Sequence, residues 1–173
     1  MALAAESAQT LLERDREGAA AELKRVSELA RGAMEELRAV VFELRPASLE
    51  AEGLATVLRK HVEVLRRVSG RTIVLKVRDV PRLEPDCATQ ILRIAQEALG
   101  NAVRHSGATC IKVMLEGHTL TVSDNGSGFD PTEVRGQRLG LTSMQERATE
   151  LGGAFTVTST VGEGTTVRLE VPA

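Results

Sequence analysis

Aromatic residues are nearly absent from this chain, which has no tryptophan, no tyrosine and 3 phenylalanines among its 173 residues. Platforms on which nucleic-acid bases could stack are therefore missing, and a flat ligand would have to be held mainly between aliphatic side chains. The formal net charge of −2 also gives no electrostatic reason to expect a nucleic-acid partner. Both features argue against a nucleic-acid-binding protein.

Cysteine and long apolar runs are scarce too. The 2 cysteines, Cys87 and Cys110, fit neither a zinc-site spacing nor a disulfide framework, and both lie in apolar-periodic segments where a buried thiol is expected. This usage predicts a reducing, cytoplasmic environment. No apolar run approaches the roughly 18 residues of a membrane span, and no signal peptide is visible. We therefore expect no membrane contact by this piece, although its parent protein could carry an anchor.

The first 46 residues are expected to form a helical hairpin. Residues 2–13 are helix-prone, and residues 15–18 are typical of a turn. Residues 19–44 are rich in helix formers, and their apolar residues recur at alternating three- and four-residue steps: Leu23, Val26, Ala30, Ala33, Leu37, Val40 and Leu44. Because two antiparallel helices leave an apolar face open, we expect a homodimer to close a four-helix bundle. The alternative is a hairpin that packs on its own domain.

Residues 47–173 are expected to form a separate domain, because a proline directly before them ends the preceding helix. A link that runs to Gly53 leads to an amphipathic helix over residues 54–68, followed by a strand over residues 71–80. His61 lies beside the apolar face of that helix. We interpret it as a solvated or capping histidine rather than a ligand or a phosphoacceptor.

A long helix over residues 85–105 carries the first candidate site residues. Glu97 and Asn101 are one turn apart and share a helix face, and Arg104 and His105 follow near its end. An Asn carbonyl beside a Glu carboxylate could bind or support a hard divalent cation such as Mg²⁺. The simpler alternative is a solvated helix face.

A hairpin over residues 109–122 is expected to deliver Asp124 to the end of its second strand. Gly126 and Gly128 follow and would let the main chain approach a ligand closely, while the Asp124 carboxylate offers two acceptor oxygens to a ligand amino group. Taken alone, this stretch is more typical of an ordinary hairpin turn. Residues 129–139 then predict either a mobile flap over a site or an ordinary surface loop.

A second candidate site element is the helix predicted over residues 141–151, which follows Gly140. The first turn of such a helix presents backbone N–H donors and a positive dipole end, so we expect it to suit a phosphate. A last hairpin pairs residues 154–160 with residues 165–171.

Several of these segments, in this order and at this separation, resemble the motifs of the GHKL ATPase superfamily, whose fold is the Bergerat fold. The matching segments are residues 97–105 (its N-box), 124–128 (its G1 box), and 140–147, 152–153 and 162–166 (its later glycine boxes). The resemblance covers about residues 54–172. In detail the chain is similar to sensor histidine kinases of the NarL-partner type, which share a short lid and a helix that ends in Leu-Arg-Pro before the ATPase domain.

This resemblance implies an α+β fold, a two-layer sandwich in which helices cover one face of a mixed, mainly antiparallel sheet, beside the helical hairpin of a dimerisation bundle. It also implies ATP and Mg²⁺ as ligands. Asp124 would accept a hydrogen bond from the adenine amino group, and Gly126 and Gly128 would give the base room. Thr165 or Thr166 would line the adenine pocket.

The resemblance implies further roles on the phosphate side of the nucleotide. Asn101 would coordinate Mg²⁺, and Glu97 would act as, or orient, the proton acceptor in phosphoryl transfer. The groups expected near the phosphates are Arg104, His105, Gly140 and Leu141.

The phosphoacceptor histidine of these kinases has no counterpart here, because no histidine precedes His61. We therefore expect a fragment that begins just beyond that motif, binds ATP and Mg²⁺, and cannot phosphorylate itself in the family's way. In the parent protein, phosphate would pass to a histidine and then to an aspartate of a NarL/LuxR-type response regulator. Two alternatives stay open: a GHKL serine kinase that regulates a sigma-factor antagonist, and a nucleotide-dependent partner-binding domain without catalysis.

Overall fold

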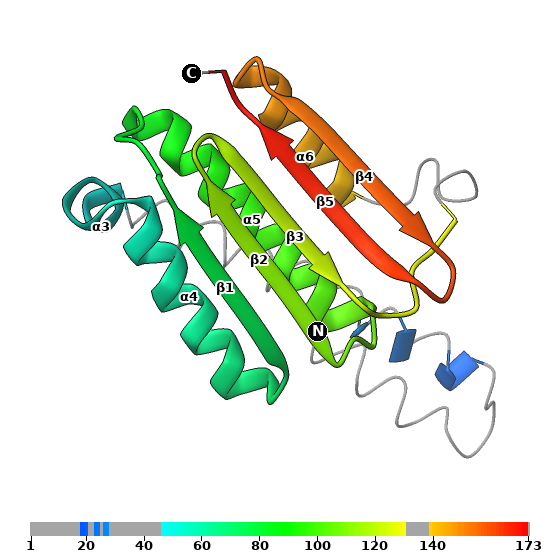
Figure 1. Ribbon diagram of the computed structural model, residues 1–173. Coiled ribbons are helices and arrows are strands. Elements are labelled where there is room, and N and C mark those ends of the chain that lie inside the picture. Colours follow the sequence, from blue (N-terminus) through cyan, green and yellow to red (C-terminus); the bar gives the residue numbers. More distant parts are fainter. Residues whose placement is uncertain (1–17, 21–22, 25, 28–45, 131–138, 173) are drawn as a thin grey trace. The chain divides into compact units, whose positions relative to one another are not determined.

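The computed structural model describes residues 18–20, 23–24, 26–27, 46–130 and 139–172 (Figure 1). The chain divides into two compact units, residues 1–46 and residues 47–173. The residues described before position 46 are helical, including Gly18, which the sequence placed in a turn. The rest of the predicted hairpin, its dimer and most of the predicted flap lie outside the described residues.

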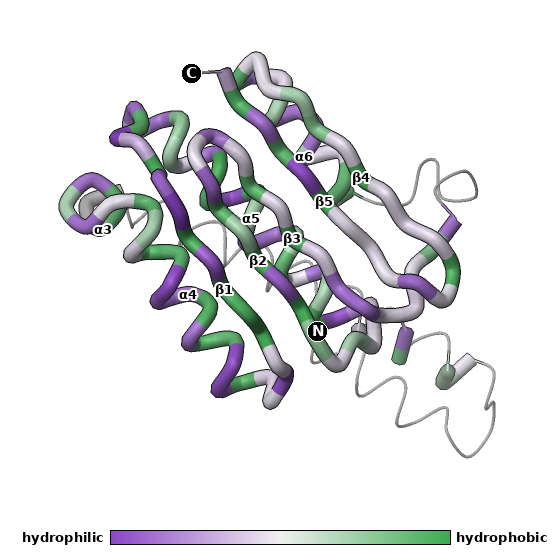
Figure 2. Tube along the Cα trace, viewed as in Figure 1, coloured by the Kyte–Doolittle hydropathy of each residue, from purple (hydrophilic) through white to green (hydrophobic). Residues whose placement is uncertain are grey.

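The second unit is built on a five-stranded sheet with the strand order β1-β2-β3-β5-β4. The first two strands run parallel, and the other neighbouring pairs are antiparallel. Buried and exposed side chains alternate along most strands, which Figure 2 shows as changes of colour. The strands are β1 (Thr72–Arg78), β2 (Cys110–Glu116), β3 (Thr119–Asp124), β4 (Ala154–Thr160) and β5 (Gly164–Glu170).

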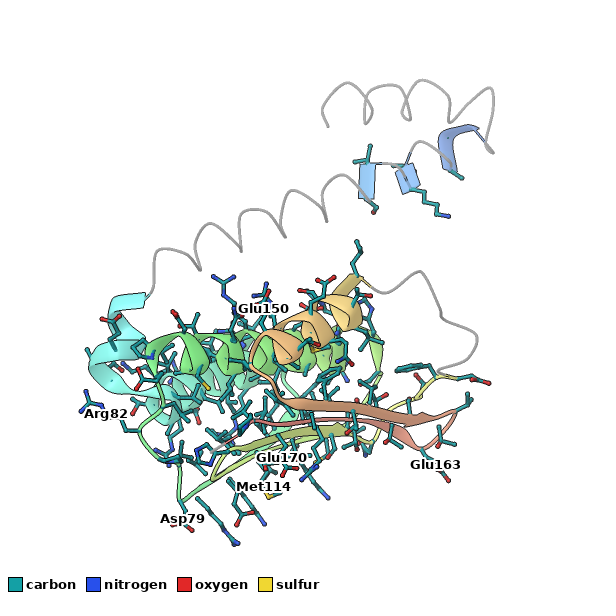
Figure 3. All side chains as sticks on the ribbon, turned by 90° about the horizontal axis from the view of Figure 1, so that it is seen from above. Asp79, Arg82, Met114, Glu150, Glu163 and Glu170 are labelled. Atoms are coloured by element: carbon teal, nitrogen blue, oxygen red, sulfur yellow. The ribbon has the colours of Figure 1, made fainter. Side chains whose placement is uncertain are left out.

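Helices α4 (Leu54–Ser69), α5 (Pro85–His105) and α6 (Leu139–Glu150) cover one face of this sheet (Figures 1 and 3). Glu150 lies on the helix side in Figure 3, whereas Met114 and Glu170 lie on the other side of the sheet, which no described helix covers. The predicted two-layer α+β sandwich with a mixed, mainly antiparallel sheet is confirmed. None of the described helices combines the length and the apolar character needed to cross a bilayer.

The central helix α5 forms the middle of the core. Ile94 and Leu99 are 0% exposed, and the sheet beneath them contributes Ile111 at 0% and Leu120 at 1%. Full burial of each such side chain stabilises the fold by about 1.5–3 kcal/mol. The predicted bounds of this helix are confirmed at both ends. The core therefore holds α5, and with it Glu97 and Asn101, in a fixed position over the sheet.

Residues 46–52 form a helix, α3 (Pro46–Glu52), where the sequence predicted a link. Proline is favourable in the first turn of a helix, because its missing N–H would have no intrahelical partner there. A helix of seven residues is also too short to show apolar periodicity. Gly53, with a φ of 76°, separates α3 from α4, and its N–H donates to the Leu49 carbonyl at 2.9 Å.

Burial affects two titratable groups of the helical layer. His61 on α4 is half-buried rather than solvated, and desolvation lowers the pKa of its imidazole. On α5, burial raises the pKa of the Cys87 thiol, which keeps it protonated and a poor nucleophile. Cys87 and Cys110 are both free and half-buried, so they are more exposed than the sequence predicted.

Candidate functional site

Asp124 is the last residue of β3, where the strand breaks into a turn. Its Oδ1 accepts a hydrogen bond from the Gly126 N–H at 2.9 Å, which fixes the start of the turn. The side chain is half-buried, and no donor of the described residues is bound to Oδ2. Because a carboxylate accepts through both oxygens, Asp124 can hold the turn and an N–H of a ligand at the same time.

Thr165 on β5 is the cross-strand partner of Asp124. Side chains of cross-strand partners lie on the same face of a sheet, and successive side chains of one strand point to opposite faces. Thr166 pairs with Ser123 and therefore belongs to the opposite face. Of the two threonines predicted to line a pocket, only Thr165 shares the face of Asp124.

The glycines of this turn are packed tightly against protein backbone. A Cβ on Gly126 would lie 2.2 Å from the Ser106 carbonyl oxygen, and one on Gly128, whose φ is 57°, would lie 1.9 Å from that of Thr160. A Cβ on Gly164, whose φ is 94°, would lie 2.0 Å from the Asp124 carbonyl oxygen. These glycines therefore let the turn, the end of α5 and the last hairpin meet. That Gly126 and Gly128 also give a base room stays a prediction.

Glu97, Asn101 and Gly140 come together between α5 and α6. A Cβ on Gly140 would lie 2.1 Å from Glu97 Oε1 and 3.4 Å from Asn101 Nδ2. Gly140 was predicted to precede the helix, but α6 begins at Leu139, so Gly140 lies inside the first turn. Its lack of a side chain lets the first turn of α6 approach the Glu97 carboxylate, rather than marking the helix boundary.

The donor set at Glu97 and Asn101 fits a magnesium ion that is shared with a ligand. No group of three or more His, Cys, Asp or Glu side chains within the described ranges could hold a metal by itself. Mg²⁺ commonly takes only one or two protein oxygens and completes its octahedron with waters and substrate phosphates. One amide oxygen next to one carboxylate meets that requirement.

Arg104 and His105 are exposed in the last turn of α5. The Arg104 guanidinium extends back along the helix, where its Nη2 would lie 3.0 Å from a Cβ placed on Gly100. Leu141 is half-buried in the first turn of α6. The structure thus places these three residues on the predicted elements, and it brings Gly140 close to both Glu97 and Asn101.

Two residues that hold the Asp124 turn in place were not predicted from the sequence. Ser106, 8% exposed, donates from Oγ to the Ala102 carbonyl, and its own carbonyl accepts the Ser127 N–H at 2.7 Å. The Asn125 Oδ1 accepts the backbone N–H groups of Thr109 at 3.1 Å and Cys110 at 2.9 Å. Both tie the Asp124 turn to the end of α5 and the start of β2. A serine at a helix end and an Asn in a turn were the available signals.

Comparison with known families gives two matches along the chain. The family model described as "Histidine kinase-, DNA gyrase B-, and HSP90-like ATPase" matches residues 87–173, which is half of the chain. A second model, described as "Histidine kinase", matches residues 1–49. Both matches agree with the resemblance seen in the sequence motifs.

Curated relatives carry related names. The sensor histidine kinase LiaS of Bacillus subtilis is 36% identical over 154 residues, which cover 87% of this chain and 42% of that protein. The sensor protein VraS of Staphylococcus aureus is 34% identical over 143 residues, which cover 79% of this chain and 40% of that protein. The chain therefore spans less than half the length of these relatives.

Solved structures share the fold. The histidine kinase domain of the blue-light activated histidine kinase EL346 of Erythrobacter litoralis has a TM-score of 0.58 at 23% identity, covering 69% of this chain and 64% of that one. The histidine kinase AdeS of Acinetobacter baumannii has a TM-score of 0.56 at 16% identity, covering 96% and 91%. At these identities the likeness is one of fold alone.

Proposed function

Because the chain belongs to the family of histidine kinase-, DNA gyrase B- and HSP90-like ATPases, we propose that residues 47–173 are the ATP-binding catalytic domain of a two-component sensor histidine kinase. The observation that carries this proposal is the approach of Gly140 to Glu97 and Asn101, with a Cβ position only 2.1 Å from Glu97 Oε1. A carboxylate and an amide are held there beside the first turn of a helix. That combination suits a magnesium–phosphate group.

On the base side, Asp124 accepts a hydrogen bond from the adenine amino group through Oδ2, while Oδ1 keeps its bond to the Gly126 N–H. Thr165 lines the same pocket from the neighbouring strand. The scarcity of aromatic residues means that aliphatic side chains hold the ring. Asp124 therefore supplies the polar contact that orients the base.

On the phosphate side, Asn101 would provide an oxygen ligand to Mg²⁺, and the bound ion would neutralise charge on the phosphates. Glu97 accepts or orients the proton of the attacking group. Backbone N–H groups of Gly140 and Leu141 face the phosphates, and the cations of Arg104 and His105 lie at the end of α5. Phosphoryl transfer requires mainly such positioning and charge neutralisation.

We place residues 1–46 in a helical dimerisation element and the piece as a whole in the cytoplasm. The γ-phosphate passes to a histidine of the parent protein, as the resemblance to sensor histidine kinases implies; the first 60 residues of this chain contain no histidine. The phosphoryl group then passes to an aspartate of a response regulator, for which the sequence motifs favour the NarL/LuxR type. Transfer to a serine of a separate protein would support the serine-kinase alternative instead.

Calorimetric titration with ATP and Mg²⁺ tests this proposal, with a matched pair of glycine variants. Gly140→Ala places a methyl group 2.1 Å from Glu97 Oε1, whereas in Gly100→Ala the new methyl meets only the flexible end of Arg104 at 3.0 Å. Gly100 lies in the interior of α5, so its change to alanine favours the helix by about 0.5–1 kcal/mol. Gly140 lies in the first turn of α6, where the added methyl group must displace the Glu97 carboxylate. We expect Gly140→Ala to weaken ATP binding roughly tenfold or more, since small displacements of positioned groups have large effects.

Gly100→Ala should weaken ATP binding far less than Gly140→Ala, because the flexible end of Arg104 can move aside from the new methyl group and still reach the phosphates. Equal affinities of the two variants would contradict the assignment of Glu97 and Asn101 to the phosphate side. Absence of ATP binding by the wild type, in a chain that unfolds cooperatively, would overturn the proposed function itself.

A further inference from the structure

We propose that Ser159 is a positioning residue, whose hydroxyl orients the O–H of Thr165 and so favours a base edge that donates hydrogen bonds. This inference rests on the proposed ATP site. Ser159 lies near the end of β4, next to the turn that carries Glu163 in Figure 3. It belongs to none of the motifs that led to the site.

Three side chains form a row across β3, β5 and β4. Thr165 is the cross-strand partner of both Asp124 and Ser159. Buried Val122 and Val167 lie two residues from Asp124 and Thr165 on the same strands, so the row belongs to the helix-covered face. Ser159 is therefore one strand further from Asp124, with Thr165 between them.

The Ser159 hydroxyl has three neighbours at hydrogen-bond distance. The Phe129 N–H donates to Oγ at 2.9 Å, and Oγ donates to the Gly164 carbonyl at 3.0 Å. The third neighbour, Thr165 Oγ1 at 2.9 Å, can act either as donor or as acceptor. A serine hydroxyl has one proton and two acceptor positions, so all of its capacity is used when Thr165 donates to it.

The two backbone neighbours of Ser159 determine whether Ser159 or Thr165 donates the hydrogen bond between their hydroxyl groups. An N–H group can only donate and a carbonyl can only accept, so the single proton of Ser159 belongs to Gly164 and the proton of Thr165 belongs to Ser159. Thr165 Oγ1 is then left with lone pairs alone. A ligand beside Asp124 and Thr165 therefore meets two acceptors and no hydroxyl donor.

This arrangement suits a purine that carries an amino group at its six position. The amino group of adenine offers two N–H donors, whereas hypoxanthine has a carbonyl oxygen in the same place. An acceptor oxygen set against Asp124 and Thr165 would stay unpaired, which is unfavourable in a partly buried site. Ser159 thus contributes to the preference for adenine without touching the base.

The test compares binding of ADP and inosine diphosphate, each with Mg²⁺, by calorimetry on wild type and Ser159→Ala. In the variant the Thr165 proton is released and can turn toward the six-oxo group. We expect the ratio of the dissociation constant for inosine diphosphate to that for ADP to fall about fivefold to tenfold in the variant. A change of this size corresponds to the gain or loss of one neutral hydrogen bond. Ser159→Thr keeps the hydroxyl and should restore the ratio. Thr158→Ala, on the exposed face of the same strand, should leave it unchanged.

If Ser159 had a purely structural role, Ser159→Ala would weaken the binding of both nucleotides equally and leave the ratio of their dissociation constants unchanged. An unchanged ratio in a folded Ser159→Ala would therefore overturn the inference. Should that variant fail to fold, Thr165→Val gives the second measurement. Loss of the Thr165 hydroxyl must reduce the ratio, and an unreduced ratio would likewise overturn the inference. Failure of the wild type to bind ADP would overturn the proposed function as well.

Discussion

His61 makes the stability of the fold depend on pH. It is half-buried on α4, and burial lowers the pKa of its imidazole below the ordinary value of 6.5. The unfolded chain then binds a proton at a higher pH than the folded chain, so acidification favours unfolding. The stabilising contribution is fully present above pH 6.5 and is lost as the pH falls below it toward the folded-state pKa.

The corresponding measurement is urea denaturation between about pH 7.5 and pH 5.5, the window around the ordinary histidine pKa. We predict that the free energy of unfolding falls more steeply with decreasing pH in the wild type than in His61→Gln, which cannot take up a proton there. Parallel pH profiles for the two proteins would show that His61 is not desolvated in the folded state.

Single residues differ in how far the sequence alone predicts their part in the site. Asp124, Glu97 and Asn101 are predicted as site residues because their chemistry is local to short segments of sequence. The position of Gly140 is not predicted, because its need for a bare Cα arises from the Glu97 carboxylate, 43 residues away along the chain. A glycine ahead of an amphipathic pattern more often marks a helix boundary, so the sequence predicts a helix that begins after Gly140.

At the scale of elements, Gly162 in the β4–β5 turn and Gly164 at the start of β5 have different surroundings. Gly162 has a φ of 85°, and a Cβ there would meet nothing within 4 Å. Gly164 has a φ of 94°, and a Cβ there would lie 2.0 Å from the Asp124 carbonyl oxygen. An alanine at the first position adds only backbone strain of about 1–2 kcal/mol. At the second, it also pushes β5 away from the end of β3.

We predict that Gly162→Ala lowers the free energy of unfolding by about 1–2 kcal/mol, whereas Gly164→Ala lowers it by more than about 4 kcal/mol or prevents folding. Chemical denaturation of both variants beside the wild type measures the difference. If the two alanines were tolerated equally, β3 and β5 could not approach each other as closely as the structure has them.

Periodicity predicted the regular elements well, because each buries one face. The strands alternate with period two, and α4 and α5 carry apolar stripes along their length. Periodicity does not predict helix α3, because its seven residues are too few to display an apolar stripe. A proline after a helical pattern also indicates the end of one helix, whereas Pro46 begins another. Hairpin turns, by contrast, can be predicted from a few local residues such as Gly117, whose φ is 55°.

For the whole molecule, the order of strands decides which predicted residues meet. The register that pairs Asp124 with Thr165 joins segments that are distant in the chain, and neither segment indicates the other. The same holds for Ser106 and Ser127, and for Ser159 and Phe129. Family resemblance supplied this arrangement in outline, but the supporting hydrogen bonds became visible only in the fold.

The central claim is that the carboxylate of Asp124 accepts a hydrogen bond from the base of a bound adenine nucleotide. Asp124→Asn tests it most directly, because the amide can keep an acceptor for the Gly126 N–H while replacing the second oxygen by a donor. Glu170→Gln, the same chemical change on an exposed side chain of β5, is the control. Scanning calorimetry follows unfolding without a tryptophan, which the chain lacks.

With Mg²⁺ and ADP at about 100 times Kd, wild type and Glu170→Gln should gain about 2.7 kcal/mol. That gain corresponds to a rise in Tm of roughly 5 to 11 °C for a chain of this size. Asp124→Asn should melt with the wild type when no nucleotide is present and lose most of the nucleotide-dependent rise. An equal rise in Asp124→Asn and wild type would contradict the account, because the base would then be held without the Asp124 carboxylate.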